Sequence, residues 1–225
     1  MSVQAAMGRA ADRSASASNE SQGAAGWLGR LGDWPVALLW GLAALALRLH
    51  RLGAQSLWLD EGGSWHEATQ RSWGFLLAEL WSPRSGYPLY HLLLKGWVAL
   101  FGDSEIALRL PSALAGALLV SAVYLLGARL HGRRLGGLAA ALLLANPFAL
   151  WQAQDAKTYS LVMLAAALSL LALWNALTLG GRRRWLAWIG LLALLLSLHR
   201  LALFAVIGQV AALVAAGGLE RRTKL

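Results

Sequence analysis

The sequence contains no cysteine, and charged residues make up only 14% of its 225 positions. The absence of cysteine excludes disulfides, thiolate nucleophiles and zinc–thiolate sites. Hydrophobic residues make up 58%, which is too high a fraction for a soluble domain of ordinary composition. They occur in long blocks without charge, and such blocks indicate membrane spans.

Acidic residues are scarce, with 11 Asp and Glu against 20 Lys and Arg, so the net charge is +9. In a membrane protein, basic loops hold helices on the cytoplasmic side, so we expect no nucleic-acid partner. Residues 1–33 are rich in Ser, Ala, Gly and Gln and have no apolar core typical of a secretory signal. We predict that they form a disordered cytoplasmic tail. Residues 220–225 are predicted to be a basic cytoplasmic end.

The apolar blocks predict an all-α, polytopic transmembrane bundle of about six spans. The stretch 185–219 is too long for one span, since it would reach about 52 Å across a hydrocarbon core of about 30 Å. His199 and Arg200 lie near its middle, where charge is costly, so we place a turn there. The predicted spans are 34–52, 110–128, 135–153, 158–181, 185–198 and 201–219. Three polar residues at the end of the first, Arg48, His50 and Arg51, have long side chains that could snorkel to the interface.

The segment 87–101 is short, apolar and interrupted by Lys95, so it could be a span, a re-entrant piece or an interfacial helix. Basic clusters at 129–134, 182–184 and 221–224 are predicted to be cytoplasmic. Counting spans between them favours an interfacial helix within a long extracytoplasmic first loop, 53–109, that carries juxtamembrane helices. Residues 154–157 and 199–200 then lie outside too, and both termini lie inside a plasma (inner) membrane. If 87–101 crossed instead, Asp60 would be cytoplasmic.

Two acidic positions are candidates for chemistry. Asp60 and Glu61 are adjacent carboxylates close to the bilayer, where partial desolvation would raise the pKa of one and make it a better base. The alternative is that Asp60 caps a short helix. Asp155 lies in a polar island with Lys157, which could pair with it or neutralise a phosphate; the alternative is an ordinary interfacial turn.

Other polar residues flank these positions. His199, with Arg200, forms a third island, although a His–Arg turn is more often a topological stop. A further group opens the 87–101 segment, where contact with lipid headgroups is the commoner role: Arg84, Tyr87, Tyr90 and His91. The predicted topology puts all of these on one side of the membrane. Carboxylates for base catalysis, cations for phosphate and aromatic rings for sugar stacking would then share one cavity.

The order of five motifs resembles a known family. The motifs are SLWLDEGGSW (56–65), YPLYHLLLKGW (87–97), FGDSEIALRLPSALAG (101–116), NPFALWQAQDAKTYSL (146–161) and LHRLALF (198–204). Together they resemble polytopic glycosyltransferases of the GT-C type that use polyprenyl-phosphate sugars. These include protein O-mannosyltransferase and lipid A aminoarabinose transferase relatives and an uncharacterised bacterial branch.

The resemblance implies roles for particular residues. Asp60 and Glu61 would deprotonate the acceptor or act with a divalent metal ion, for which Asp155 is also a candidate ligand. Lys157 stands where relatives often carry Arg and would contact the donor phosphate, beside Tyr159. His199 matches a common histidine. The sequence departs from relatives at Gly86-Tyr87-Pro88, where a polar residue before two prolines is usual.

We therefore predict a glycosyltransferase of the hexosyltransferase class, or the N-terminal half of one, because relatives are longer and a second chain could complete the fold. It would transfer a sugar, with inversion, from a polyprenyl-phosphate donor to a lipid, glycan or protein hydroxyl. The alternative is a non-catalytic membrane scaffold or lipid-binding subunit. A small transporter is disfavoured, because the predicted spans are nearly free of charge.

Overall fold

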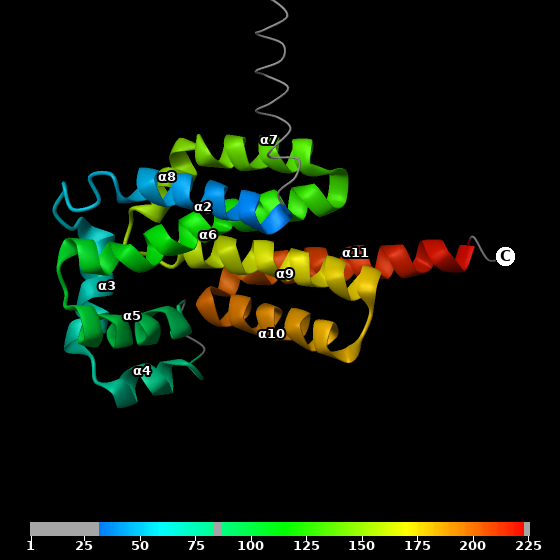
Figure 1. Ribbon diagram of the computed structural model, residues 1–225. Helices are drawn as coiled ribbons and strands as arrows, with labels where there is room; N and C mark the ends of the chain where they lie inside the picture. The colour runs from blue at the N-terminus through cyan, green and yellow to red at the C-terminus, as the bar shows by residue number, and fades with distance from the viewer. Residues whose placement is uncertain (1–31, 83–86, 223–225) are drawn as a thin grey trace, which may run out of the picture.

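The computed structural model describes residues 32–82 and 87–222 (Figure 1). Nearly all of the predicted tail and Arg84 lie outside the described residues. The described residues form helices and connecting segments without a β-strand, which confirms the all-α prediction.

Six helices run alongside one another as a bundle, and three shorter helices gather at one end of it (Figure 1). The bundle helices are α2 (Asp33–Leu49), α6 (Glu105–His131), α7 (Arg133–Leu144), α9 (Tyr159–Leu179), α10 (Arg182–Leu198) and α11 (Leu203–Arg222). The end helices are α3 (Leu59–Gln70), α4 (Trp73–Glu79) and α5 (Pro88–Phe101). Two short elements, α8 (Pro147–Ala153) and the 3-10 helix η1 (Arg200–Ala202), complete the chain.

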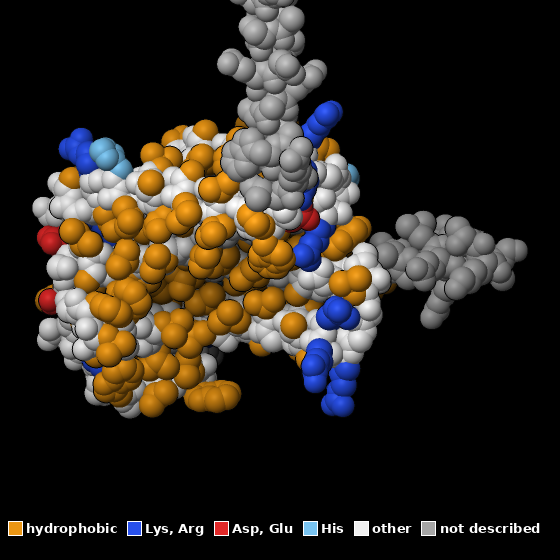
Figure 2. Space-filling view, viewed as in Figure 1, with side chains coloured by type: hydrophobic (Ala, Val, Ile, Leu, Met, Phe, Trp, Pro, Cys, Tyr) orange, Lys and Arg blue, Asp and Glu red, His pale blue; other side chains and the backbone are white. Residues whose placement is uncertain are grey.

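The apolar surface identifies a membrane protein. Figure 2 shows a broad hydrophobic belt over the bundle, with charged side chains gathered toward its two ends. By length and composition, two helices of the described residues, α6 and α9, could cross a membrane; the bent pair α7–α8 would be a third if it forms one span. The other predicted spans lie on α2, α10 and α11 and stay predictions.

The connections that carry the basic clusters lie at one end of the bundle, and the other connections lie at the opposite end. The loop after α2, the α8–α9 loop and the turn between α10 and η1 lie at the same end as α3 and α5 (Figure 1). The α6–α7 and α9–α10 connections, which carry the basic clusters, lie at the opposite end. This is the grouping that the positive-inside rule would produce in a membrane.

The block 135–153 was predicted as one span, and its crossing of the membrane stays a prediction, but the block is not one continuous helix. It is two helices, α7 and α8, that meet at an angle of 66°. The break follows from Asn146 and Pro147: the Asn146 side chain accepts a hydrogen bond from the Ala149 N–H at 3.0 Å, as an N-cap does. Proline then occupies the first turn of the new helix, where its missing N–H costs nothing.

Arg48 was one of three residues predicted to be able to snorkel to the interface, and for Arg48 this prediction is wrong. Its side chain is fully buried and donates only to the Ala44 carbonyl, at 3.3 Å. The guanidinium packs against Gly116 of α6, where an added Cβ would lie 2.8 Å from Arg48 Nε. Arg109 of α6, one position before the predicted span 110–128, is also buried.

Helices α6 and α7 approach closely through two glycines. A Cβ added to Gly136 would lie 2.7 Å from the Tyr124 carbonyl oxygen, and one added to Gly127 would lie 2.8 Å from Gly136 Cα. Small residues at such contacts let two helix backbones pack tightly where the hydrophobic effect does not drive association. The α6–α7 contact therefore depends on the absence of side chains at these positions.

An ion pair joins the end helices to the bundle. Arg109 of α6 donates to Glu61 of α3 from Nε to Oε1 at 2.7 Å and from Nη2 to Oε2 at 2.6 Å. The two side chains are 5% and 1% exposed. Arg109 also donates to three carbonyl oxygens of the loop after α2, those of Leu52, Gln55 and Ser56.

Glu61 completes this junction from its side. Its Oε1 accepts a hydrogen bond from the Ala156 N–H at 2.9 Å, and its Oε2 a longer one from the Trp58 N–H at 3.4 Å. Burial alone would raise the pKa of Glu61, but these hydrogen bonds and the Arg109 charge lower it below its ordinary value of 4.5. One carboxylate thus ties together α3, α6, the loop after α2 and the α8–α9 loop.

Replacing Gly136 by leucine should force α7 away from α6. Overpacking of this kind costs about 1–3 kcal/mol, so the melting temperature of the protein in detergent should fall by several degrees. The control is Gly137→Leu, because a Cβ at Gly137 meets nothing within 4 Å. Equal melting temperatures for the two variants would contradict the close contact.

Replacing Glu61 by leucine should destabilise the protein by about 3–5 kcal/mol, because the charge of Arg109 stays buried without its partner. The double variant Glu61→Leu/Arg109→Leu should lose less than the two single variants combined. Because folding lowers the pKa of Glu61, its stabilisation is fully present above the ordinary value of 4.5 and is lost as the pH falls below that value toward the lowered folded-state pKa. Denaturant titration at pH 7 and pH 3 measures both effects; additive losses in the double variant would contradict the pairing.

Candidate functional site

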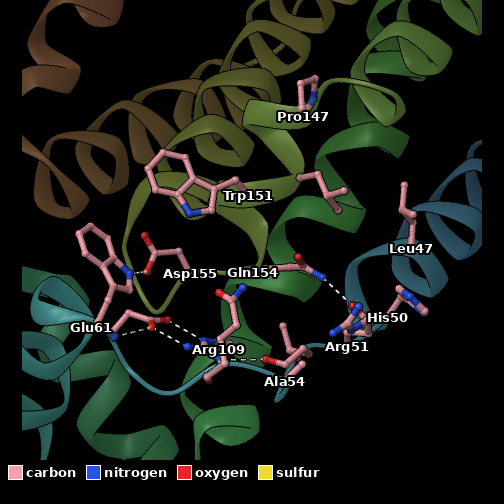
Figure 3. Close-up of a pocket in the computed structure, with 14 residues that line it drawn as sticks. Leu47, His50, Arg51, Ala54, Glu61, Arg109, Pro147, Trp151, Gln154 and Asp155 are labelled. Atoms are coloured by element: carbon pink, nitrogen blue, oxygen red, sulfur yellow. Dashed lines mark hydrogen bonds and ion pairs between the residues drawn. The ribbon is translucent and has the colours of Figure 1, made fainter.

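Two cavities open where the loops meet at the end of the bundle. We call the first, of about 450 Å³, the Arg51 cavity; it is lined by Leu47, His50, Arg51, Leu52, Ala54, Gln55, Trp58, Glu61, Arg109, Pro147, Leu150, Trp151, Gln154 and Asp155 (Figure 3). The second, of about 500 Å³, is the Asp60 cavity; it is lined by Trp58, Asp60, Phe148, Trp151, Gln152, Asp155, Tyr159, Val162 and Met163. Three residues line both, namely Trp58, Trp151 and Asp155.

Asp155 lies in the short segment between α8 and α9 and is 3% exposed. The Trp58 indole N–H donates to its Oδ1 at 3.0 Å, across 97 positions of sequence. Burial, and also the nearby Glu61 carboxylate, raise the pKa of Asp155 to about 6, although the Trp58 hydrogen bond opposes the shift. A carboxyl group with such a pKa can change protonation near physiological pH, as functional carboxyl groups often do.

Asp60 is the second residue of α3, and its side chain is exposed toward the Asp60 cavity. The alternative that Asp60 caps this helix is wrong, because Trp58 occupies the N-cap position. Among the described residues, none donates a hydrogen bond to the Asp60 carboxylate, so its oxygens can accept one from a ligand.

Glu61 differs from its neighbour, although both were predicted as site residues. It lines the Arg51 cavity, but Arg109, Ala156 and Trp58 already donate four hydrogen bonds to its two oxygens. These hydrogen bonds leave little capacity for taking up a proton or coordinating a metal ion. Within the described part of the chain, no group of three or more His, Asp or Glu side chains could hold a metal. The three predicted ligands do not form a ligand set as they stand, so we derive no step through a metal.

The predicted aromatic residues form a cluster beside the Asp60 cavity. The ring of His199 lies 4.9 Å from that of Tyr87 and 5.9 Å from that of Tyr159, and the ring of His91 lies 6.0 Å from that of Tyr87. Burial lowers the pKa of His91 and of His199, so both imidazoles are neutral at pH 7. Since Tyr159 lines the cavity, the cluster offers neutral rings and polar ring atoms to a ligand there.

Tyr90 and Lys157 lie behind this cluster. Tyr90 is 2% exposed, its Oη has no hydrogen-bond partner of ordinary geometry, and burial raises its pKa. Lys157 is half-buried and lines neither cavity, yet its charge is near enough to lower the pKa of both Asp155 and His91. Its backbone carbonyl accepts a hydrogen bond from Ser112 Oγ of α6 at 2.9 Å.

The sequence-based prediction missed three residues that build this site. Arg109 and Trp58 lie within two of the motifs but were assigned no role. Arg51 was interpreted only as an interfacial cation. Arg109 and Trp58 contribute through contacts with residues distant in the sequence, and Arg51 through the conformation of a turn. A single sequence reveals neither the distant contacts nor the turn conformation.

Comparison with known proteins supports the resemblance at the level of family. No curated protein and no solved structure matches the chain. The family model described as dolichyl-phosphate-mannose-protein mannosyltransferase matches residues 83–224. The match includes Asp155, Lys157, Tyr159 and the aromatic cluster, and it begins after Asp60 and Glu61. The match covers well over half of the sequence, and so the chain belongs to the dolichyl-phosphate-mannose-protein mannosyltransferase family, a family of membrane glycosyltransferases that use polyprenyl-phosphate sugars.

Proposed function

We propose that this chain transfers a sugar from a polyprenyl-phosphate donor to an acceptor hydroxyl, and that the transfer takes place in the Asp60 cavity. Family membership supports the reaction class. The observation that carries the proposal is that Asp60 and Asp155, 95 positions apart in the chain, line the same cavity. Both also lie within reach of the aromatic cluster through Tyr159.

Asp60 is the proposed general base. Its exposed carboxylate has the capacity to take a proton from the acceptor hydroxyl, whereas Glu61 is already engaged by Arg109. The hydroxyl oxygen then forms a bond to the anomeric carbon from the face opposite the phosphate. The bond from that carbon to the phosphate oxygen breaks, its electron pair leaves with the phosphate, and the anomeric configuration inverts. A positioned base of this kind contributes about 10²–10⁴-fold to the rate.

The remaining residues would orient the sugar and stabilise the leaving phosphate. Asp155, held by the Trp58 indole, is placed to accept a hydrogen bond from a sugar hydroxyl. Lys157 lines neither cavity, but its charge acts on Asp155, and we assign it to stabilising the negative charge that the phosphate gains, the usual role of a cation in such a transition state. The Tyr87–Tyr159–His199 rings offer faces for stacking against the sugar.

The reaction is proposed to take place on the extracytoplasmic side of the plasma membrane. The site lies at the end of the bundle opposite the basic α6–α7 and α9–α10 connections. Basic connections are retained on the cytoplasmic side, so the site would face outward and both termini inward. A donor anchored in the outer leaflet would then reach the Asp60 cavity with its sugar.

The variant Asp60→Asn should lose sugar transfer by about 10²-fold or more while the protein keeps its melting temperature, because the exposed side chain stabilises little. The assay is transfer of a radiolabelled sugar from a polyprenyl phosphate by protein purified in detergent. The control is Glu67→Gln on the same helix, where the carboxylate only pairs with Arg71 at 3.4 Å. Equal transfer by wild type and Asp60→Asn would remove Asp60 from this role, and lipid binding without transfer by wild type would favour the non-catalytic alternative.

Activity should rise with pH through about 6, because the raised pKa keeps Asp155 protonated below that value and only the ionised carboxylate offers both of its oxygens purely as acceptors. The measurement is kcat/KM between pH 5 and pH 8. Asp155→Asn can keep the hydrogen bond from Trp58 but has no charge. Its kcat/KM should be lower than that of wild type and should not rise with pH through about 6. If kcat/KM of Asp155→Asn still rose with pH through about 6, the rise would be due to the titration of another group.

A further inference from the structure

We propose that the Arg51 cavity binds the phosphate group of a membrane lipid, at a site separated from the sugar-transfer cavity by Trp58 and Trp151. Of the residues that line this cavity, the proposed transfer reaction uses only Trp58 and Asp155, which also line the Asp60 cavity. Its character differs from that of the Asp60 cavity, because its open end carries a cation where the Asp60 cavity carries a carboxylate.

The lining of the Arg51 cavity is amphipathic. One flank is apolar and consists of Leu47, Pro147, Leu150 and Trp151. The other is polar and consists of His50, Arg51, Gln55 and Gln154. The apolar flank continues onto the outer surface, since Leu47 is 39% and Trp151 is 54% exposed. A ligand with a polar head and a hydrocarbon chain would contact both flanks, whereas a small soluble anion would leave the apolar flank unused.

The positive charge of Arg51 is available to such a ligand. Two carboxylates line the cavity, but Glu61 is paired with Arg109 and Asp155 accepts from Trp58. Figure 3 shows both of them at the end of the cavity away from His50 and Arg51. In the described segments, no carboxylate lies within ion-pair distance of Arg51. A guanidinium presents a planar pair of donors, the geometry that suits a phosphate.

The turn that presents Arg51 is held by the neighbouring loop. The Gln154 side-chain amide donates to the carbonyls of Arg48 at 3.0 Å and His50 at 2.8 Å. Arg51 has a φ of 57°, a left-handed conformation that no other non-glycine residue of the described chain adopts. Such a conformation is unfavourable for arginine and persists only where its surroundings impose it. The backbone that carries the cation is therefore held in this conformation before a ligand arrives.

The position in the molecule suits a lipid headgroup. Figure 2 shows Lys or Arg and His side chains together where α2 ends, at the rim of the hydrophobic belt. Phosphates of membrane lipids lie at this level, directly beyond the hydrocarbon core. The chain would thus meet a lipid phosphate at Arg51 and the lipid chain along Leu47 and Leu150.

Lipid binding by the full chain in detergent tests this proposal, with native mass spectrometry to count bound lipids. The probes are a polyprenyl phosphate, phosphatidic acid, uncharged diacylglycerol and inorganic phosphate. Arg51→Asn keeps the turn, because asparagine tolerates a positive φ, but removes the charge. It should bind phosphatidic acid about 10- to 100-fold more weakly than wild type, the effect of one lost charge-assisted hydrogen bond. A polyprenyl phosphate should lose only the part of its binding that occurs in the Arg51 cavity, because it also binds in the Asp60 cavity as the donor.

The controls separate the site from general charge effects. Arg71→Asn removes a surface arginine outside both cavities and should bind as wild type does, and Arg51→Lys should keep most of the affinity. Diacylglycerol should bind wild type and Arg51→Asn equally weakly. Equal phosphatidic acid affinity for wild type and Arg51→Asn would overturn the proposal. Inorganic phosphate that binds as tightly as the lipids would overturn the assignment to a lipid. Asp60→Asn should retain lipid binding, so this proposal and the proposed transfer reaction can fail separately.

Discussion

The Arg109–Glu61 ion pair is the constraint on which the site depends. Arg109 belongs to a central bundle helix, and it gathers α3 and the carbonyls of the loop after α2 around one guanidinium. Glu61 adds the α8–α9 loop through the Ala156 N–H. A buried charge pair is stable only when its remaining donors and acceptors are satisfied, and here both members are. The three chain segments cannot separate without exposing unpaired charge to the protein interior.

The ion pair gives three nearby carboxylates different surroundings, namely those of Asp60, Glu61 and Asp155. Glu61 is engaged by Arg109, so its neighbour Asp60 points away from the pair and into the Asp60 cavity. The loop that donates to Glu61 also carries Asp155, which is thereby brought beside both the Glu61 charge and the Trp58 indole. The adjacent residues Asp60 and Glu61 therefore differ in role because only one of them faces Arg109.

Trp58 connects the two cavities. It lies at the N-cap of α3, it donates to Asp155, and its ring lies 6.3 Å from that of Trp151. A carboxylate and a cation thus occupy opposite sides of one aromatic wall, in cavities of similar size. Because the two cavities are separate, the proposed proton acceptor Asp60 and the proposed anion site at Arg51 lie near each other without forming an ion pair.

Local sequence determined the helical class, the apolar blocks, the turn at His199–Arg200 and the grouping of polar residues, because each depends on neighbouring residues and on the thickness of a membrane. The Asn146–Pro147 break was also encoded locally, in a cap and a proline, and was overlooked inside an apolar block. Only the tertiary structure decided which acid is engaged and which is available. That choice depends on Arg109, 48 positions from Glu61, and on a tryptophan 97 positions from Asp155. Burial and hydrogen bonding between such distant positions arise when helices pack, so no local pattern of residues records them.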